Sequence, residues 1–312
     1  MNHICVYGTV FNSVNTVKKS ISSVFNSSYD IIVVDNYSSD GTWEKLQELK
    51  KEYNLLLFRL RSSRGKGRAY ALKHCPDNSL TVFFDLDSNY NENFHKILRT
   101  EINGIDVGTL IIRKEDIIRK GNWRDLNAGE DYELEVRVGF KYKLPVIVSL
   151  DQKIEGVREA RYVKNRTALL FRLLKKYIDS TRALNYSLKD LLTLYKGKYK
   201  LLSVLLYPIP LLLGKYSYEK GVNNWVLYSY KATYSLTNPK DLGLQISDDY
   251  ISIGYPIPFM IFKNRKYFIS LDEFEKILKE RLGEMKKFSY RDYIIYAKNE
   301  DAFKHTLEAY YF

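Results

Sequence analysis

The chain has 312 residues, of which 45% are hydrophobic and 28% charged, so it can build one large or two smaller globular domains and is too apolar to be disordered. Its net charge is +12, and residues 1–150 hold 21 Lys and Arg against 19 Asp and Glu, whereas the remainder holds 28 against 18. No run reaches the roughly 18 to 20 apolar residues of a membrane-spanning helix, and the N-terminus lacks a signal-peptide pattern, so we expect an intracellular protein.

The first part of the chain alternates between strand and helix patterns. Apolar runs predict strands at residues 3–10, 31–34, 55–60 and 80–84. Helical spacing predicts helices at residues 14–25, 43–53 and 64–74, the second of them capped by Asp40. Such alternation predicts a parallel sheet with βαβ units, in which ligands bind beyond the carboxyl ends of the strands. We therefore expect the residues at these ends to form one site: Thr9, Asp35, residues 64–68, Asp85 and Asp87.

Two carboxylates, Asp85 and Asp87, follow the strand at residues 80–84. Residues two apart in an extended chain point to the same side, so both acids can converge on one point. They would repel each other unless a positive charge lay between them. A hard divalent cation that keeps water ligands and also takes phosphate oxygens suits this pair. The alternative is a turn in which Asp and Asn serve as turn formers.

Residues 64–68 alternate basic side chains with two glycines, which lets backbone N–H groups and cations approach a diphosphate. The segment lacks the spacing of a phosphate loop and the three-glycine dinucleotide fingerprint, so by itself it is more typical of a turn. Asp35, at a strand end, can accept a hydrogen bond from the imide N–H of uracil or a comparable base edge.

Taken together, four segments resemble family 2 glycosyltransferases of the GT-A fold, which are α/β proteins with a mostly parallel sheet flanked by helices. The segments are residues 35–42, 64–69, 85–87 and 127–134. Residues 121–123 lie where that family often has a Gly-Gly-aromatic turn. The resemblance covers about the first half of the chain, and it depends on the order and the gaps of the segments more than on any one of them.

The resemblance implies a role for each position. Asp35 would hold the nucleobase, and Asp87 with Asp85 would bind Mn²⁺ or Mg²⁺ at the diphosphate of the sugar donor. Asp131 would be the general base, with Glu130 beside it; without the family pattern, this pair is more typical of a helix start. Residues 9–12 would line the nucleoside pocket. The full set expected to bind the donor is Thr9, Phe11, Asn12, Asp35, Asn36, Arg64, Lys66, Gly67, Arg68 and Asp85, with Trp123 on the acceptor side.

The sequence also departs from the family. Residues 8–12 lack the usual proline, and the strand predicted at residues 146–150 is followed by Asp151 without a nearby His to serve as a third metal ligand. The Gln-x-x-Arg-Trp motif of processive synthases is absent, so we expect one sugar to be transferred per encounter.

The basic excess is concentrated in residues 161–200, which contain 11 Lys and Arg and only two acidic residues, Asp179 and Asp190. Residues 161–178 predict a basic amphipathic helix, and residues 201–214 form an apolar run broken by Pro208 and Pro210. This combination favours contact with an anionic membrane face. The alternative is a basic helix docked on the catalytic domain, with the apolar run as ordinary core. No nucleic-acid-binding module is recognised, so we expect no nucleic acid partner.

The tail, from about Asp241, predicts a small α+β unit. Strands are expected at residues 250–253, 257–262, 267–269 and 293–297, with a turn at 263–266 and a helix from Ser270 to Leu282. The predicted organisation is a catalytic domain at residues 1–158, a basic helical region at 159–240 and the C-terminal unit at 241–312. Cys5 and Cys75 are expected to be buried thiols and not a disulfide, and the scattered histidines show no ligand spacing.

The hypothesis at this stage is a metal-dependent, inverting glycosyltransferase that uses a nucleotide-diphosphate sugar and acts on a hydroxyl of a lipid-linked acceptor. We expect it to lie peripherally on the cytoplasmic face of the cell membrane. Two alternatives stay open. A polyprenyl-phosphate acceptor would need no general base, and a non-catalytic membrane-bound scaffold would keep the fold without turnover.

Overall fold

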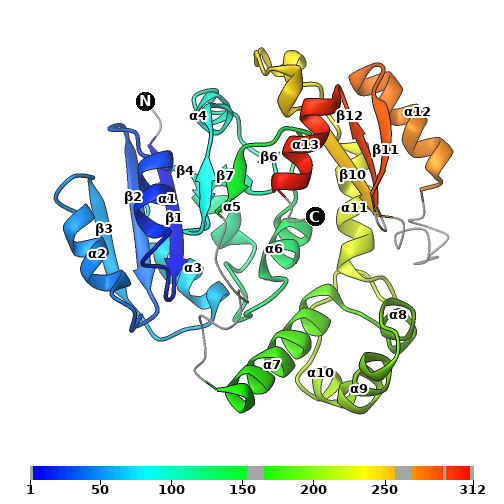
Figure 1. Cartoon of the computed structure of the whole chain (residues 1–312), viewed down its shortest axis with the longest axis horizontal. Helices are drawn as coiled ribbons and strands as arrows, with labels where there is room; N and C mark the ends of the chain where they lie inside the picture. Colours follow the sequence, from blue (N-terminus) through cyan, green and yellow to red (C-terminus); the bar gives the residue numbers. More distant parts are fainter. Residues whose placement is uncertain (1–2, 153–164, 257–268, 291–292, 310–312) are drawn as a thin grey trace.

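The computed structural model describes residues 3–152, 165–256, 269–290 and 293–309 (Figure 1). The N-terminal part is built on a seven-stranded sheet of order β3-β2-β1-β4-β7-β6-β8. The first four strands run parallel, β7 runs antiparallel to both β4 and β6, and β8 is parallel to β6. The strands are β1 (Ile4–Val10), β2 (Tyr29–Asp35), β3 (Leu55–Arg59), β4 (Leu80–Phe83), β6 (Ile105–Asp106), β7 (Leu110–Arg113) and β8 (Tyr142–Lys143).

The sheet is buried on both faces, which explains why its strands are continuously apolar. In β1, Ile4, Val6 and Val10 point into one hydrophobic core, whereas Cys5 and Tyr7 point into another on the opposite face. The helices α1 (Val17–Val24), α2 (Thr42–Leu49) and α4 (Glu92–Leu98) cover the first face. The helices α3 (Arg64–Lys73), α5 (Lys114–Arg119) and α6 (Glu130–Val138) cover the second.

The strands and helices predicted before residue 85 are confirmed, with shifts of a few residues at their ends. The cap of α2 is Gly41, and Asp40 accepts from the backbone N–H of Thr42 at 3.0 Å. The strand predicted at residues 146–150 is shorter: β9 (Ser149–Asp151) pairs with β5 (Ser88–Tyr90) in a separate two-stranded sheet.

Four helices follow the sheet, namely α7 (Arg166–Leu184), α8 (Leu188–Leu194), α9 (Lys198–Leu206) and α10 (Pro208–Leu212), and they lie at the lower edge of Figure 1. Within the described part of the chain, no helix is both long enough and apolar enough to cross a membrane. The predicted apolar run forms α9, α10 and the turns beside them. Its side chains are largely exposed, including Leu205 at 66% and Leu212 at 87%, so the alternative that this run is ordinary core is wrong.

The helix α11 (Asn224–Tyr234) leads through two short 3-10 turns, Pro239–Leu242 and Asp248–Tyr250, to the C-terminal unit. There β10 (Ser252–Pro256), β12 (Tyr293–Ala297) and β11 (Lys286–Tyr290) form an antiparallel sheet, accompanied by α12 (Leu271–Leu282) and α13 (Glu300–Ala309). The predicted α+β character, the helix after Ser270 and the strand at residues 293–297 are confirmed. The strand predicted at 257–262, the turn at 263–266 and most of the strand at 267–269 lie outside the described residues.

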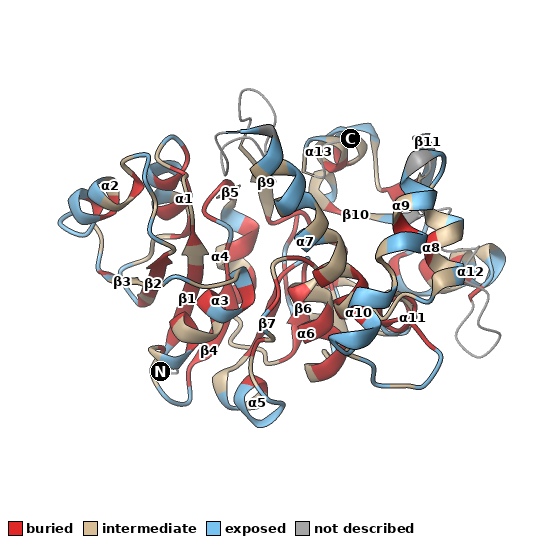
Figure 2. Ribbon diagram, turned by 90° about the horizontal axis from the view of Figure 1, so that it is seen from below, coloured by how far each residue is buried: buried red, intermediate tan, exposed pale blue. Residues whose placement is uncertain are grey.

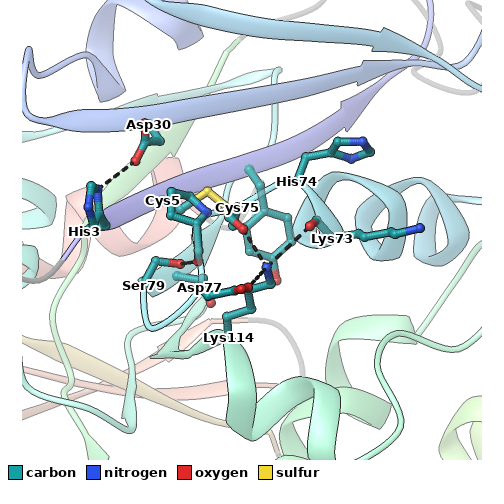
Figure 3. Close-up of a disulfide and its surroundings, with 12 residues drawn as sticks. His3, Cys5, Asp30, Lys73, His74, Cys75, Asp77, Ser79 and Lys114 are labelled. Carbon is teal, nitrogen blue, oxygen red and sulfur yellow. Dashed lines mark hydrogen bonds and ion pairs between the residues drawn. A yellow bond between two sulfur atoms is a disulfide. The ribbon is translucent and has the colours of Figure 1, made fainter.

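The prediction of two free thiols is wrong, because Cys5 and Cys75 form a disulfide (Figure 3). Cys5 lies in β1 and Cys75 follows α3, and both are buried. The main-chain carbonyl of Cys75 also accepts from Lys114 Nζ at 2.6 Å, and the same amine contacts Asp77 at 2.7 Å. The bond therefore fixes the C-terminal end of α3 to the strand on which the helix packs.

Candidate functional site

The carboxyl ends of β1, β2 and β4 meet at a polar cleft, as the sequence predicts for a parallel sheet. Thr9 and Phe11 come from the end of β1, Asn36 follows β2, and Asp85 and Asp87 follow β4. The cleft thus unites segments that are far apart in the sequence. Its lining residues are Thr9, Val10, Phe11, Ser13, Asn36, Arg64, Asp85, Leu86, Asp87, Asn127 and Arg172.

Asp85 and Asp87 both line this cleft but differ in exposure. The Asp85 side chain is 53% exposed, and its Oδ1 accepts from Arg68 Nη2 at 2.7 Å. Asp87 is nearly buried, and its main-chain carbonyl accepts from Gln152 N at 2.8 Å. Asp151, next to Gln152, accepts from Ser88 Oγ at 2.5 Å. Among the described residues, no group of three or more His, Cys, Asp or Glu could hold a metal ion.

Two carboxylates nevertheless fit one kind of metal site. Mg²⁺ and Mn²⁺ favour oxygen ligands, and Mg²⁺ commonly takes one or two protein carboxylates and completes its shell with water and substrate phosphates. Asp85 and Asp87 supply that number of carboxylates at the edge of an open polar cleft. The donor set therefore fits a cation that binds together with a diphosphate.

Arg68 is buried, which differs from the predicted phosphate-binding role. Its guanidinium is 2% exposed and bridges Asp85 Oδ1 at 2.7 Å and Glu130 Oε1 at 3.0 Å. It also lies over the rings of Phe83 and Trp123, at 4.4 and 5.0 Å from their centroids. Arg68 thus holds two carboxylates in position from within the core, and its guanidinium does not face the cleft.

Trp123 is likewise in the core and not on the acceptor side. It is 5% exposed, its Nε1 donates to Tyr7 OH at 3.0 Å, and its ring packs edge-to-face on Phe83. An aromatic ring held in this way beneath Arg68 cannot stack on an acceptor.

Glu130 and Asp131 begin α6, and Gly129 makes this start possible. Gly129 has φ +70°, and a Cβ there would lie 3.0 Å from Ala183 Cβ of α7, so a side chain would be strained and crowded. Glu130 is fully buried and accepts from Arg68 and, at 3.4 Å, from Arg64 Nη1. Its Oε2 finds no hydrogen-bond partner among the described residues.

Asp131, the second residue of α6, has a carboxyl whose pKa is raised. Burial and the neighbouring charge of Glu130 raise the pKa of the Asp131 carboxyl to about 6, although Arg68 acts in the opposite direction. A base that titrates near neutral pH combines a sizeable ionised fraction with enough basicity to take a proton.

Gly65 and Gly67, the two glycines between the basic residues, allow close packing of α3 against its neighbours. A Cβ on Gly65 would lie 2.0 Å from the main-chain oxygen of Arg124, and one on Gly67 would lie 2.6 Å from Thr9 Oγ1. Gly67 therefore lets α3 approach β1 and does not itself line the cleft. Lys66 is exposed and also lies outside the lining, whereas Arg64 forms part of it.

Asp35 occupies the predicted strand end, but its side chain is enclosed. It is fully buried, its Oδ2 accepts from Arg59 Nε at 2.9 Å, and both oxygens accept from Ser38 N at 3.2 Å. Asn12, at φ +49°, accepts through Oδ1 from Ser39 N at 2.9 Å. These bonds order the loops after β1 and β2, and Asn36 forms the adjacent wall of the cleft.

Arg172 and Asn127 also line the cleft. Asn127 begins the segment 127–134 that resembles the family, although no role was predicted for it, and no motif points to Arg172 as a site residue. Asp179 Oδ2 accepts from Asn127 N at 3.0 Å, and Ala183 lies against Gly129. Arg172, Asp179 and Ala183 share one face of α7, because they are seven and four residues apart. This face of α7 therefore packs on the catalytic part. The sequence shows that these three residues share one helix face, but it does not show what that face packs against.

A second, largely apolar cavity of about 330 Å³ adjoins α6. Val107 and residues 143–147 contribute from the ends of β6 and β8, Tyr132 from α6, and Trp225 and Tyr228 from α11. Because β4, β6 and β8 point the same way, this cavity lies at the same edge of the sheet as the cleft.

Comparison with known proteins agrees with this geometry. Residues 5–143 match the family described as Glycosyl transferase family 2, and the match contains the cleft's strands, Asp85, Asp87 and Asp131. This segment belongs to glycosyl transferase family 2. The glycosyltransferase domain has the mostly parallel, helix-flanked sheet of the GT-A fold, as predicted. No curated protein matches the chain.

Several solved structures are similar at low identity. S. aureus TarS is 12% identical to this chain, with a TM-score of 0.45, and the alignment covers 96% of this chain and 61% of TarS. The chain therefore spans about three fifths of the length of TarS. S. aureus TarS 1–349 in complex with UDP-GlcNAc is 13% identical with a TM-score of 0.48, covering 96% and 99%. The mannosyltransferase PcManGT from Pyrobaculum calidifontis, in complex with GDP-Man and Mn²⁺, is 14% identical with a TM-score of 0.43, covering 67% and 69%.

Proposed function

We propose that the chain is a metal-dependent, inverting glycosyltransferase that moves a sugar from a nucleotide-diphosphate sugar to a hydroxyl group. The observation that carries this proposal is the convergence of Asp85, Asp87, Arg64 and Arg172 on one cleft of a family 2 domain, with Asp131 at the start of α6 beside it. Two acids and two guanidinium groups form a charge pattern suited to a cation and a diphosphate bound together.

Each side chain has a chemical task in this scheme. A cation held by Asp85 and Asp87 would neutralise charge on the departing nucleotide diphosphate. Arg64 and Arg172 would donate to its phosphate oxygens. Asp131 would take the proton from the acceptor hydroxyl, whose oxygen bonds to the anomeric carbon opposite the breaking bond to the diphosphate. This direction of attack inverts the anomeric centre. Glu130 is fully buried and paired with Arg68, so it would hold the start of α6 in place and would not touch the sugar.

We place the acceptor in the second cavity instead of at Trp123. The aromatic lining of this cavity includes Tyr132, which is next to Asp131 in α6, and it offers an apolar surface on which a sugar ring can stack. The acceptor we propose is lipid-linked and reaches the site at the cytoplasmic membrane face.

A thermal-shift screen of nucleoside diphosphates with and without Mn²⁺ tests the donor and the metal together. One nucleotide should stabilise the protein, by about 2.7 kcal/mol at a hundredfold excess over Kd, and it should do so more strongly with Mn²⁺ than with EDTA. Asp87→Asn should abolish the Mn²⁺ increment. Asp77→Asn is the matched control, because Asp77 is exposed and pairs with Lys114 away from the cleft. Equal stabilisation with Mn²⁺ and EDTA would contradict metal dependence.

A further inference from the structure

Exposed apolar side chains gather in one part of the molecule. Of sixteen large hydrophobic residues that are exposed in the described chain, eleven lie between residues 170 and 213. Several are extreme, with Leu212 87%, Phe171 68% and Leu205 66% exposed. Clustering of this kind marks an interaction site. We call the set the apolar surface: Leu170, Phe171, Leu173, Tyr199, Leu201, Val204, Leu205, Ile209, Leu211, Leu212 and Leu213.

The apolar surface is spread over three helices that contact one another. Figure 2 looks onto the side of the molecule where α7, α9 and α10 lie, and long stretches of these helices are coloured as exposed. The helices contact one another, and Tyr177 OH of α7 donates to the main-chain oxygen of Ser203 in α9 at 3.1 Å. Leu201 and Leu205 are four residues apart in α9, so they project in one direction.

The same region is strongly basic. Residues 165–220 contain eleven Lys and Arg against three Asp and Glu. Two of these acids are engaged within the fold: Asp179 accepts from Asn127, and Asp190 accepts from Ser187 N at 2.7 Å in a capping box. Exposed lysines lie on the helices of this region and on the turn before α9, namely Lys175 on α7, Lys189 on α8, Lys196 on the turn and Lys200 in α9. The chemistry is therefore that of an anion-binding rim around an apolar centre.

We propose that the apolar surface docks on an anionic lipid bilayer. Lysine is depleted from protein–protein interfaces, whereas leucine, tyrosine and lysine together are typical of helices that lie in a membrane interface. Stable attachment to a bilayer commonly needs two signals, and this region supplies buried apolar area and electrostatic attraction together. The docking does not depend on the proposed transfer reaction.

The position of the docking helices also bears on the catalytic cleft. One face of α7 carries Arg172 into the cleft, whereas Tyr177, on another side of the helix, contacts α9, and α7 also contacts α10. A bilayer bound to the apolar surface would therefore lie close to the donor site. An acceptor held in that bilayer would need to extend only its head group.

Vesicle co-sedimentation of the full chain tests the docking. The protein should bind vesicles of phosphatidylcholine mixed with phosphatidylglycerol, bind phosphatidylcholine alone at least tenfold more weakly, and dissociate as salt is raised. The double variant Leu205→Ser/Leu212→Ser should lose at least tenfold in partition to the mixed vesicles. The control is Leu56→Ser/Ile118→Ser, which changes two exposed apolar residues on β3 and α5, 47% and 44% exposed, outside the apolar surface. This variant should bind as the wild type does.

Two results would overturn the proposal. One is wild-type binding to anionic vesicles by the Leu205→Ser/Leu212→Ser variant with an unchanged melting temperature. The other is a wild-type dimer that this variant converts to a monomer, because the surface would then join two copies of the chain. Nucleotide binding measured on the same variants should stay unchanged, so a failure of docking can be distinguished from a failure of the proposed transferase function.

Discussion

At the scale of single residues, Arg68 connects the parts of the candidate site. It is among the largest fully buried side chains, and its guanidinium holds Asp85 of the cleft to Glu130 at the start of α6. Phe83 and Trp123 lie against its planar group. This buried cation therefore fixes the position of both carboxylates.

Removing the Arg68 charge should therefore be severe. Arg68→Met leaves Glu130 buried without its closest partner, and breaking a buried pair in this way costs roughly 3–5 kcal/mol of unfolding free energy. Arg64→Met is the matched control, because Arg64 contacts the same Glu130 oxygen from a 44% exposed position. It should change stability by less than about 1 kcal/mol. Urea titration of both variants measures the difference, and equal losses would contradict the assignment.

The Asp131 carboxyl predicts a pH dependence. A base must be ionised to take a proton, and the pKa of this group is raised to about 6, so kcat/KM should rise with pH up to about 6 and level off above it. Asp131→Asn should lower transfer to a hydroxyl acceptor by about 10²–10⁴-fold and leave nucleotide binding intact. Near-normal turnover of the variant would instead favour a polyprenyl-phosphate acceptor, which is ionised already.

At the scale of elements, the N-terminal turn of α3 packs against the segment that leads to α6. Gly65 donates to the main-chain oxygen of Leu126 at 2.9 Å, and there is no room for a Cβ beside Arg124. This contact places Arg64 and Arg68 within reach of Glu130. The disulfide between Cys5 and Cys75 secures the other end of the same helix.

Gly65→Ala should destabilise the protein by roughly 1–3 kcal/mol, because the backbone it would meet must move. Gly254→Ala provides the control, since a Cβ there meets nothing within 4 Å and the residue has no positive φ. Thermal unfolding of the two variants tests the contact. An unchanged melting temperature for Gly65→Ala would show that α3 does not require this close approach.

At the scale of the whole molecule, the second half of the chain completes the cleft. Arg172 of α7 lines a cleft whose other basic side chain, Arg64, comes from α3, more than a hundred residues earlier. The same helix then joins α9 and α10 of the apolar surface. The helix α7 therefore connects the cleft with the apolar surface.

Arg172→Ala should weaken nucleotide-diphosphate binding by about tenfold or more, because a hydrogen bond to a charged group contributes roughly 1.5–3 kcal/mol. Lys175→Ala is the control on the same helix, since Lys175 is exposed and does not line the cleft. Calorimetric titration of both variants in the absence of vesicles measures the effect. Equal affinities for the two variants would remove Arg172 from the donor site.

The local pattern of the chain was enough to predict the strands and helices around the cleft, the convergence of Asp85 with Asp87 and the family. The strands, the helices and the convergence follow from periodicity and strand ends, which are properties of neighbouring residues, whereas the family follows from the resemblance of four short segments. Asp131, Asn36, Thr9 and Arg64 were predicted from the resemblance; the last three line the cleft, and Asp131 lies at the start of α6.

Only the tertiary structure decided which side chains face inward. It buried Arg68 and Trp123, enclosed Asp35 against Arg59, joined Cys5 to Cys75 across 70 residues and brought Arg172 to the cleft. It also left residues 201–213 exposed, although their composition would equally suit a core. Composition records how apolar or charged a residue is, whereas exposure depends on which element packs over it, and that contact is made by parts of the chain far away in sequence.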